Sequence, residues 1–137
     1  LKDIDGRCLC GDIHWEASLD PELVGVCHCN DCQTVGGSAF QFTTRVARHH
    51  FTVLSGALTV YEKIAESGNP RAMSFADFAT MIHTGSTDNT GLLSLRLGGC
   101  RQRHEFMPRF QIWCQSALSW ATFQSGIKVP AQELPAK

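Results

Sequence analysis

Five of the seven cysteines lie within the first 32 residues, and their spacing constrains the fold more than any other feature of the chain. They form two short motifs, Cys8-Leu-Cys10 and Cys27-His-Cys29-Asn-Asp-Cys32. An odd number of cysteines cannot all pair within one chain, and clustered cysteines lack the spread of a disulfide framework. The spacing therefore favours a metal site over a set of disulfides.

The second motif brings three thiols within six residues. Zinc binds thiolates at about 2.3 Å in a tetrahedron, and so short a loop surrounds one ion at little cost in chain entropy. Three ligands leave the fourth position open, as in catalytic zinc sites. We predict that Cys27, Cys29 and Cys32 bind such a zinc, with about one ion per chain. The alternative is that the three are reduced, buried thiols that act as small apolar side chains.

The other cysteines give a weaker pattern. Cys8 and Cys10 form half of a second zinc site, which needs two further ligands from elsewhere in the chain. Cys100 and Cys114 are separated by thirteen residues and lack the C-x-x-C spacing that would complete it, so we assign them no metal role. His28 lies between two predicted ligands, and we expect its ring to turn outward, as a solvated or supporting histidine that does not bind the metal.

Hydrophobic patterning predicts a mainly β chain. Ile13, Trp15 and Ala17 alternate with polar residues, which is typical of a half-buried strand over residues 6–17. An apolar run at 23–26 leads into the cysteine loop, which ends at Gly36-Gly37-Ser38. Aromatic and β-branched content with regular turn signals predicts further strands. These cover residues 39–44, 51–54, 57–62, 71–75, 81–84, 92–97 and 110–114.

Length and charge exclude several classes of protein. A chain of 137 residues with 43% hydrophobic residues suits one domain, here residues 1–137, with a poorly ordered tail at 128–137. A net charge of -1 provides no field that would attract nucleic acid. No apolar run approaches the roughly 18 residues of a membrane span, and no signal peptide is visible, so we expect a cytoplasmic protein. The sequence does not specify an oligomeric state.

The order of motifs resembles one known family. Gly6-Arg-Cys8-Leu-Cys10-Gly11, the Cys27–Cys32 motif, Gly37-Ser-Ala-Phe40 and Leu54-Ser-Gly56 together resemble the glutathione-dependent formaldehyde-activating enzymes, a family that also includes centromere protein V. The resemblance extends from about residue 6 to residue 123. It implies a mainly β fold of several small antiparallel sheets around two zinc sites, one structural and one catalytic. Cys27, Cys29 and Cys32 match the catalytic triplet.

At the structural zinc site this chain departs from the family pattern. The family combines the early C-x-C, here Cys8 and Cys10, with a later C-x-x-C that follows a phenylalanine. At the matching place this chain has Ala76 and Ala79, which cannot bind metal. We therefore treat Cys8 and Cys10 as the remnant of a structural zinc site.

Two ways of compensating for the lost ligands follow from the neighbouring residues. Apolar packing by Phe75, Phe78 and Met81 would replace the metal. Alternatively, Asp77 or His83 would complete a poorer zinc site with the remaining cysteines.

The resemblance implies a zinc-dependent carbon-sulfur lyase whose partner is a small thiol such as glutathione. Its thiolate, formed on zinc, attacks formaldehyde and gives S-hydroxymethylglutathione. Because three thiolates on Zn²⁺ leave a net charge near -1, thiol exchange is favoured over water activation. Arg45 or Arg48 would anchor a glutathione carboxylate. The alternative function is a zinc-binding module without glutathione chemistry, which serves as an interaction domain or acts on another small thiol or aldehyde.

Overall fold

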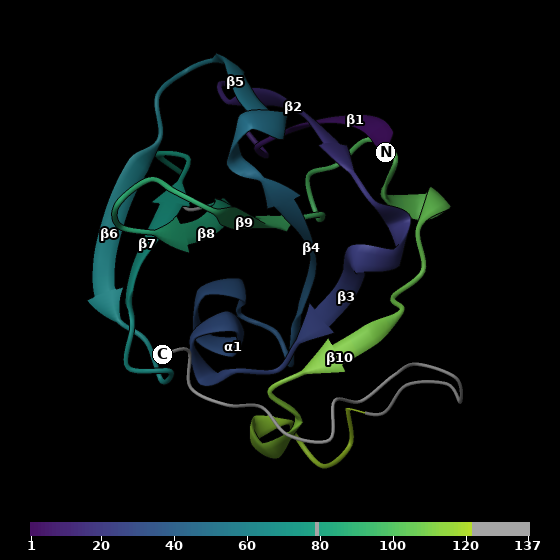
Figure 1. The fold of residues 1–137 in the computed structure, drawn as a ribbon, viewed down its shortest axis with the longest axis vertical. Helices are drawn as coiled ribbons and strands as arrows, with labels where there is room; N and C mark the ends of the chain where they lie inside the picture. The colour runs from purple at the N-terminus through teal and green to yellow at the C-terminus, as the bar shows by residue number, and fades with distance from the viewer. Residues whose placement is uncertain (79, 122–137) are drawn as a thin grey trace.

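In the computed structural model, which describes residues 1–78 and 80–121, ten strands form two sheets (Figure 1). One sheet has three strands in the order β1-β2-β5 and the other has seven in the order β10-β3-β4-β9-β8-β7-β6. The strands are β1 Lys2–Arg7, β2 His14–Leu19, β3 Val24–Cys27, β4 Gln41–Ala47, β5 Phe51–Ser55, β6 Thr59–Ile64, β7 Pro70–Phe75, β8 Met81–Ser86, β9 Leu92–Arg96 and β10 Phe110–Ile112.

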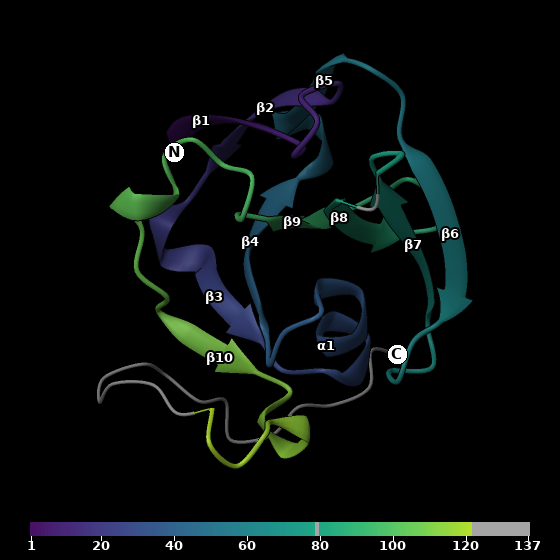
Figure 2. The same ribbon diagram turned by 180° about the vertical axis from the view of Figure 1, so that it is seen from behind.

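The predicted mainly β fold is confirmed, with one difference in the sheets. All neighbouring strands are antiparallel except β10 and β3, which run parallel. Seven of the ten strands belong to one sheet, so this sheet is larger than the small sheets that the family resemblance implies. Figures 1 and 2 show this sheet curving around the single α-helix of the described chain, α1 Asn30–Gly36. The helix lies between the β3–β10 side and the β6–β7 side of the curve.

The single strand predicted over residues 6–17 is wrong, because the chain reverses within it. β1 and β2 form an antiparallel hairpin in which Gly6 pairs with Trp15. The Cys8 amide donates to the Ile13 carbonyl at 3.1 Å, and Gly11 adopts a φ of 84° that favours glycine. A Cβ at Gly6 would lie 2.2 Å from the Trp15 ring, so the close approach of the two strands requires glycine there. The predicted burial of Ile13, Trp15 and Ala17 is confirmed.

The main core joins the two sheets. Trp15 and Leu19 of the small sheet pack in one cluster with Val46, Leu95 and other residues of the large sheet. The leucine face predicted for residues 92–97 is confirmed, since Leu93, Leu95 and Leu97 have no exposed surface. Burial of each large apolar side chain stabilises the folded state by about 1.5–3 kcal/mol. These contacts hold the two sheets against each other. The packed core therefore holds the curved sheet in place, and the cysteine loop lies on the concave side of this sheet (Figures 1 and 2).

The cysteine loop contains a helix that the sequence analysis did not predict. Cys29 is the N-cap of α1, and its Sγ accepts a hydrogen bond from the Cys32 amide at 3.3 Å. Gly37 ends the helix in the left-handed conformation, with a φ of 58°. Four 3₁₀ turns complete the described structure: Pro21–Leu23, Arg48–His50, Arg103–Glu105 and Cys114–Ser116.

No helix within residues 1–78 and 80–121 is long and apolar enough to cross a membrane. The predicted tail, residues 128–137, lies outside the described residues.

Candidate metal centre

The thiols of Cys27, Cys29 and Cys32 meet at the junction of β3 and α1. Their Sγ atoms all lie within 4.8 Å of one another. Cys27 is the last residue of β3, Cys29 caps the helix, and Cys32 lies in its first turn. Cys27 and Cys32 are buried and Cys29 is half-buried. The predicted triplet is thus assembled by a strand end and one turn of helix.

The geometry suits a tetrahedral zinc. Four ligands at the Zn–S distance of about 2.3 Å lie ~3.8 Å apart at the corners of a tetrahedron, within the observed separation. Among the described residues, no histidine or carboxylate joins the three sulfurs as a further ligand. An ion held by Cys27, Cys29 and Cys32 would thus retain one open position, which is the arrangement of catalytic zinc sites.

Hydrogen bonds around His28 hold the loop in place. The His28 ring has no exposed surface, and its Nε2 lies 3.0 Å from Oε1 of Gln111. The His28 amide donates to the Ile112 carbonyl, and the Gln33 side chain donates to the carbonyls of His28 and Ser116 at 2.7 and 2.9 Å. The expectation of a solvated, outward-turned ring is therefore wrong. Because the parallel partner strand β10 covers this position, His28 supports the loop from inside.

Hydrogen bonds among the three thiols shift their pKa values in opposite directions. Hydrogen bonds from the Cys27 and Cys32 thiols lower the pKa of Cys29 to about 2. The same hydrogen bond to Cys29 raises the pKa of Cys27 above its ordinary value. Nη2 of Arg96 lies 3.6 Å from the Cys32 sulfur and adds a positive charge beside the cluster. Of the three thiols, Cys29 is thus the one whose surroundings favour the thiolate, which is the form that binds metal.

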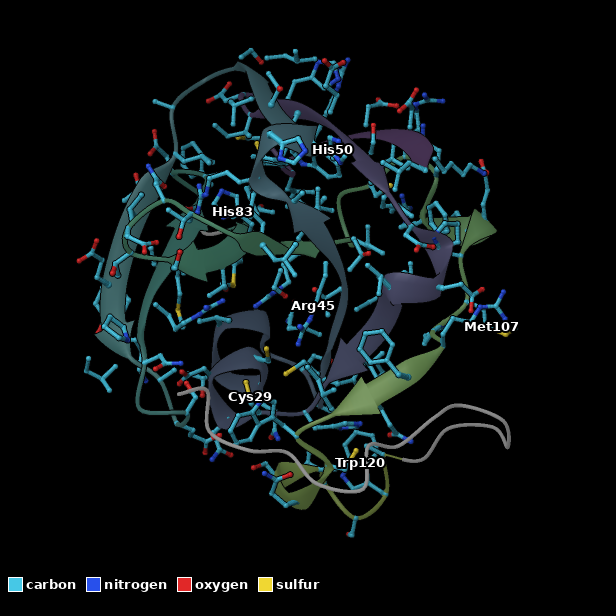
Figure 3. All side chains as sticks on the ribbon, in the orientation of Figure 1. Cys29, Arg45, His50, His83, Met107 and Trp120 are labelled. Carbon is cyan, nitrogen blue, oxygen red and sulfur yellow. The ribbon has the colours of Figure 1, made fainter. Side chains whose placement is uncertain are left out.

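A cavity of about 560 Å³ opens beside the triplet. Cys27, Cys29 and Cys32 form one wall, and Arg45, Arg71 and Arg96 reach it from the curved sheet. Figure 3 shows Cys29 and Arg45 in the central region between α1 and β4. Of the two predicted anchors, Arg45 lines the cavity and Arg48 does not. Polar side chains of Asp31, Glu66, Ser67, Asn69, Thr84, Ser86, Thr90 and Ser94 contribute further lining.

Arg71, Arg96 and Trp113 are cavity residues with functional chemistry that were not among the predicted site residues. Arg71 and Arg96 lie far from the cysteines in sequence, and only the pairing of the strands brings them there. Trp113 also lines the cavity and adopts a left-handed backbone with a φ of 57°. Such a conformation is uncommon for a bulky residue and is found disproportionately at functional sites. The one available signal was proximity in sequence to β10, which pairs with the cysteine strand.

Comparison with known proteins agrees with this geometry. The family model of the glutathione-dependent formaldehyde-activating enzymes matches residues 3–116. The chain belongs to this family. A crystal structure of a Rhodobacter sphaeroides protein shares the fold, with a TM-score of 0.56 and 18% identity, covering 76% of this chain and 97% of that chain. No curated protein matches the sequence.

In this member of the formaldehyde-activating family, the Cys8-Leu-Cys10 motif is not part of a three-ligand cluster among the described residues. The sulfurs of Cys8 and Cys10 lie 3.3 Å apart, with Cys8 buried and Cys10 exposed. Within the described part of the chain, no other histidine, cysteine or carboxylate joins these two in a group of three. Asp77 accepts a hydrogen bond from Thr59 at 3.2 Å, and the His83 ring packs edge-on against Phe51 at 5.1 Å. These contacts give both candidate replacement ligands other partners.

Apolar packing occupies part of the lost structural site. Ala76 and Cys8 are both buried and belong to the same core cluster. Met81 is buried as expected, but Phe78 is 73% exposed, so the prediction that Phe78 fills the gap is wrong. On either side of Phe78, the Ala76 amide donates a hydrogen bond to the Thr80 carbonyl at 2.9 Å. Ala79 lies outside the described residues.

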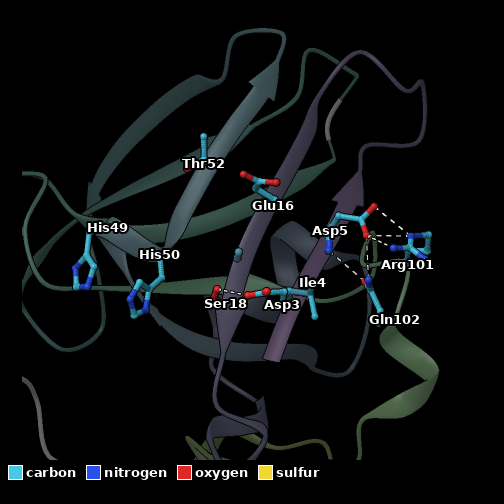
Figure 4. A pocket seen from close by; sticks show the side chains of 11 residues that line it. Asp3, Ile4, Asp5, Glu16, Ser18, His49, His50, Thr52, Arg101 and Gln102 are labelled. Carbon is cyan, nitrogen blue, oxygen red and sulfur yellow. Dashed lines mark hydrogen bonds and ion pairs between the residues drawn. The ribbon is translucent and has the colours of Figure 1, made fainter. Parts of the chain in front are cut away.

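A second cavity, of about 480 Å³, lies over β1 and β2 and contains no cysteine (Figure 4). Asp5 dominates its electrostatics. Arg101 and Gln102 each donate to this carboxylate at 2.9 Å, and these hydrogen bonds lower the pKa of Asp5 to about 2. His49 and His50 lie at the opposite end of the cavity in Figure 4. Arg101 is thus in an ion pair with Asp5, whereas no ion pair in the described residues involves Arg45, Arg71 or Arg96 of the cysteine cavity.

Proposed function

We propose that this protein binds zinc through Cys27, Cys29 and Cys32 and joins glutathione to formaldehyde. One observation carries the proposal: three sulfurs within 4.8 Å of one another form the wall of a cavity large enough for a peptide-sized thiol. Membership of the family supports the same reaction.

The proposed reaction is an addition. Zinc, when bound, would hold the substrate thiol at its open position and lower the pKa of that thiol. The thiol loses its proton to solvent, its sulfur forms a bond to the carbonyl carbon, and the carbonyl oxygen takes up a proton. The product is S-hydroxymethylglutathione, and the reverse reaction breaks the carbon-sulfur bond, as a lyase does.

The chain's own residues orient the reactants. Arg96 offsets the net charge near -1 that three thiolates would give a divalent ion, because its guanidinium lies 3.6 Å from the Cys32 sulfur. His28 and Gln33 fix the loop through buried hydrogen bonds. Arg45 is the anchor that we propose for a substrate carboxylate. Because the reaction needs reduced thiols, we propose that it takes place in the cytoplasm.

The test is to measure the zinc content and glutathione affinity of the wild type and of Cys29→Ala. We expect about one zinc per chain and saturable glutathione binding in the wild type, and loss of both in the variant. Cys10→Ala is the matched control, because it removes an exposed cysteine outside the cavity and is expected to change neither quantity. Zinc binding without glutathione affinity would contradict the proposed reaction and favour a zinc-binding module. Unchanged zinc in Cys29→Ala would contradict the metal site.

A further inference from the structure

We propose that Cys8 and Cys10 are a modification site, which forms a reversible disulfide in the presence of a small-molecule disulfide. The proposal goes beyond the proposed function, because the two thiols lie outside the cysteine cavity and their reaction needs no metal. It gives this pair a chemistry of its own in place of the structural zinc that the family pattern implies.

The residues around the pair do not fit a structural zinc. Such sites are closed by four protein ligands. Within the described residues, no histidine, cysteine or carboxylate joins Cys8 and Cys10 in a group of three. At position 76, where the family pattern has a ligand, a buried alanine packs in the same core cluster as Cys8. The pair is thus too small a ligand set to close a zinc site, and neighbouring thiols of this kind can be oxidised to a disulfide.

The fold brings the two sulfurs together. The Sγ atoms of Cys8 and Cys10 lie 3.3 Å apart, and a disulfide bond is about 2.04 Å long, so they must approach by about 1.3 Å. Two backbone hydrogen bonds of 3.1 Å hold the turn, from the Cys8 amide to the Ile13 carbonyl and from the Gly11 amide to the Cys8 carbonyl. The folded turn therefore removes much of the entropy that an open chain loses when it brings two thiols together.

The two sulfurs differ in exposure, which sets the order of the reaction. Cys10 is exposed, whereas Cys8 is 4% exposed and its sulfur accepts a hydrogen bond from the Ile13 amide at 3.2 Å. Leu9 is 95% exposed, and a Cβ placed on Gly11 would meet no atom within 4 Å, so the space around the tip of the turn is open. A disulfide from solution can therefore reach Cys10, and Cys8 reacts with Cys10 from inside.

The proposed reaction consists of two successive exchanges. The Cys10 thiol loses its proton to solvent, and its sulfur attacks one sulfur of the small disulfide, so that a mixed disulfide forms and one thiolate leaves and takes up a proton. The Cys8 thiol then loses its proton, and its sulfur attacks the Cys10 sulfur and releases the second small thiol. The two cysteines lose two electrons, and the small disulfide is reduced to two thiols. An excess of small thiol reverses both steps.

The first test treats the folded protein, supplied with zinc, with oxidised glutathione and then traps the remaining thiols with an alkylating reagent. Cleavage before Asp5 and Asp12 releases residues 5–11, which contain Cys8 and Cys10 and no other cysteine. We expect mass spectrometry to find this peptide unalkylated and lighter by two hydrogens than its reduced form. Excess reduced glutathione should restore the dithiol. A peptide that is still alkylated at both cysteines after the oxidising treatment would overturn the proposal.

The second test separates a reactive pair from a single exposed thiol. In the wild type, Cys8 removes glutathione from Cys10, so the mixed disulfide should stay rare. In Cys8→Ala we expect at least about tenfold more mixed disulfide at Cys10, because the intramolecular step is lost. Cys10→Ala is the matched control and should carry no glutathione in this peptide, since Cys8 is buried. Equal amounts of mixed disulfide in Cys8→Ala and the wild type would overturn the proposal. The first test needs no variant and does not depend on how a substitution folds.

A synthetic peptide of residues 5–11 tests whether the fold prepares the pair. At a fixed concentration of reduced glutathione, the folded protein should become half-oxidised at about tenfold less oxidised glutathione than the peptide, because the turn already holds the sulfurs 3.3 Å apart. Equal midpoints would overturn the role given to the turn.

Zinc content distinguishes this chemistry from a metal at the same pair. Zinc that falls by one ion per chain in Cys10→Ala would show that the pair binds metal and would overturn the proposal. Cys27, Cys29 and Cys32 lie outside the peptide of residues 5–11, so its mass reports on the pair alone. A disulfide in this peptide would therefore support the proposal even if the triplet failed to bind zinc or glutathione.

Discussion

The two cysteine motifs of this chain differ in how many metal ligands they bring together. Cys27, Cys29 and Cys32 keep three sulfurs within 4.8 Å at the edge of a cavity. Cys8 and Cys10 keep two, 3.3 Å apart, beside the buried Ala76. The Cys27–Cys32 motif supplies its ligands from six consecutive residues, whereas the Cys8-Leu-Cys10 motif depends on a distant segment that has alanine and not cysteine at position 76.

The difference shows how a structural metal and a reactive metal depend on their surroundings. A structural zinc stabilises the fold by linking segments, and packing or hydrogen bonds perform the same task. Here the knuckle, residues 8–13, is held by the buried Cys8 and by a hydrogen bond from the Ile13 amide to the Cys8 sulfur at 3.2 Å. No apolar side chain replaces the chemistry of an open zinc position. Loss of ligands is therefore tolerable at the structural site of Cys8 and Cys10 and not at the site of Cys27, Cys29 and Cys32.

The largest effect is expected from breaking the triplet. Cys32→Ala should abolish zinc binding, and at free zinc about 1,000-fold above the dissociation constant it should remove about 4 kcal/mol of metal-linked stability. Thermal unfolding with and without a chelator measures this contribution. Cys10→Ala should retain the full chelator effect. A chelator that leaves the unfolding temperature of the wild type unchanged would contradict a zinc site in the triplet.

Restoring the missing ligands of the Cys8-Leu-Cys10 site should have the next largest effect. Ala76→Cys with Ala79→Cys should raise zinc from about one ion per chain toward two, because it returns the missing thiolates. The gain in stability should be smaller than the loss above, since a bound ion would disturb the packing between Ala76 and Cys8. Metal analysis of the double variant decides the point. Stoichiometry unchanged from the wild type would show that the knuckle has lost more than two ligands.

Removing each knuckle cysteine should sharpen the contrast within that motif. Cys8→Ala should destabilise the protein by about 1 kcal/mol, because Cys8 is buried in the core and accepts a hydrogen bond. Cys10→Ala should change stability by less than about 0.5 kcal/mol, because Cys10 is exposed. Urea unfolding of the two variants measures both. Equal losses would contradict the assigned roles of packing and exposure.

The smallest effect concerns pH. The pKa of Asp5 falls from 3.8 to about 2 in the folded protein through hydrogen bonds from Arg101 and Gln102. Its contribution to stability is therefore complete above pH 3.8 and is lost as the pH falls toward about 2. Asp5→Asn should lower stability slightly at neutral pH and reduce its dependence on pH in this window. A variant with an unchanged acid profile would show that Asp5 does not stabilise the strand leading to the knuckle.

Local patterns made part of this structure predictable. Alternating residues located Trp15 and the leucines of β9 on buried faces, because a strand has the same period wherever it lies. The helix α1 was not predicted because its N-cap, Cys29, is not one of the usual N-cap residues, and because two glycines end the helix after only seven residues. The hairpin reversal after Arg7 was missed because the strand pattern continues on both sides of it.

The sequence by itself determined the cysteine triplet, since ligands within six residues are close in any compact conformation. It also specified the β character and the absence of thiols at positions 76 and 79. Only the tertiary structure decided that Arg45, Arg71 and Arg96 share one cavity with that triplet. These arginines are far apart in the chain, and pairing of the strands in the order β4-β9-β8-β7 brings them together. This pairing depends on the whole core, so no local sequence pattern around the arginines predicts it.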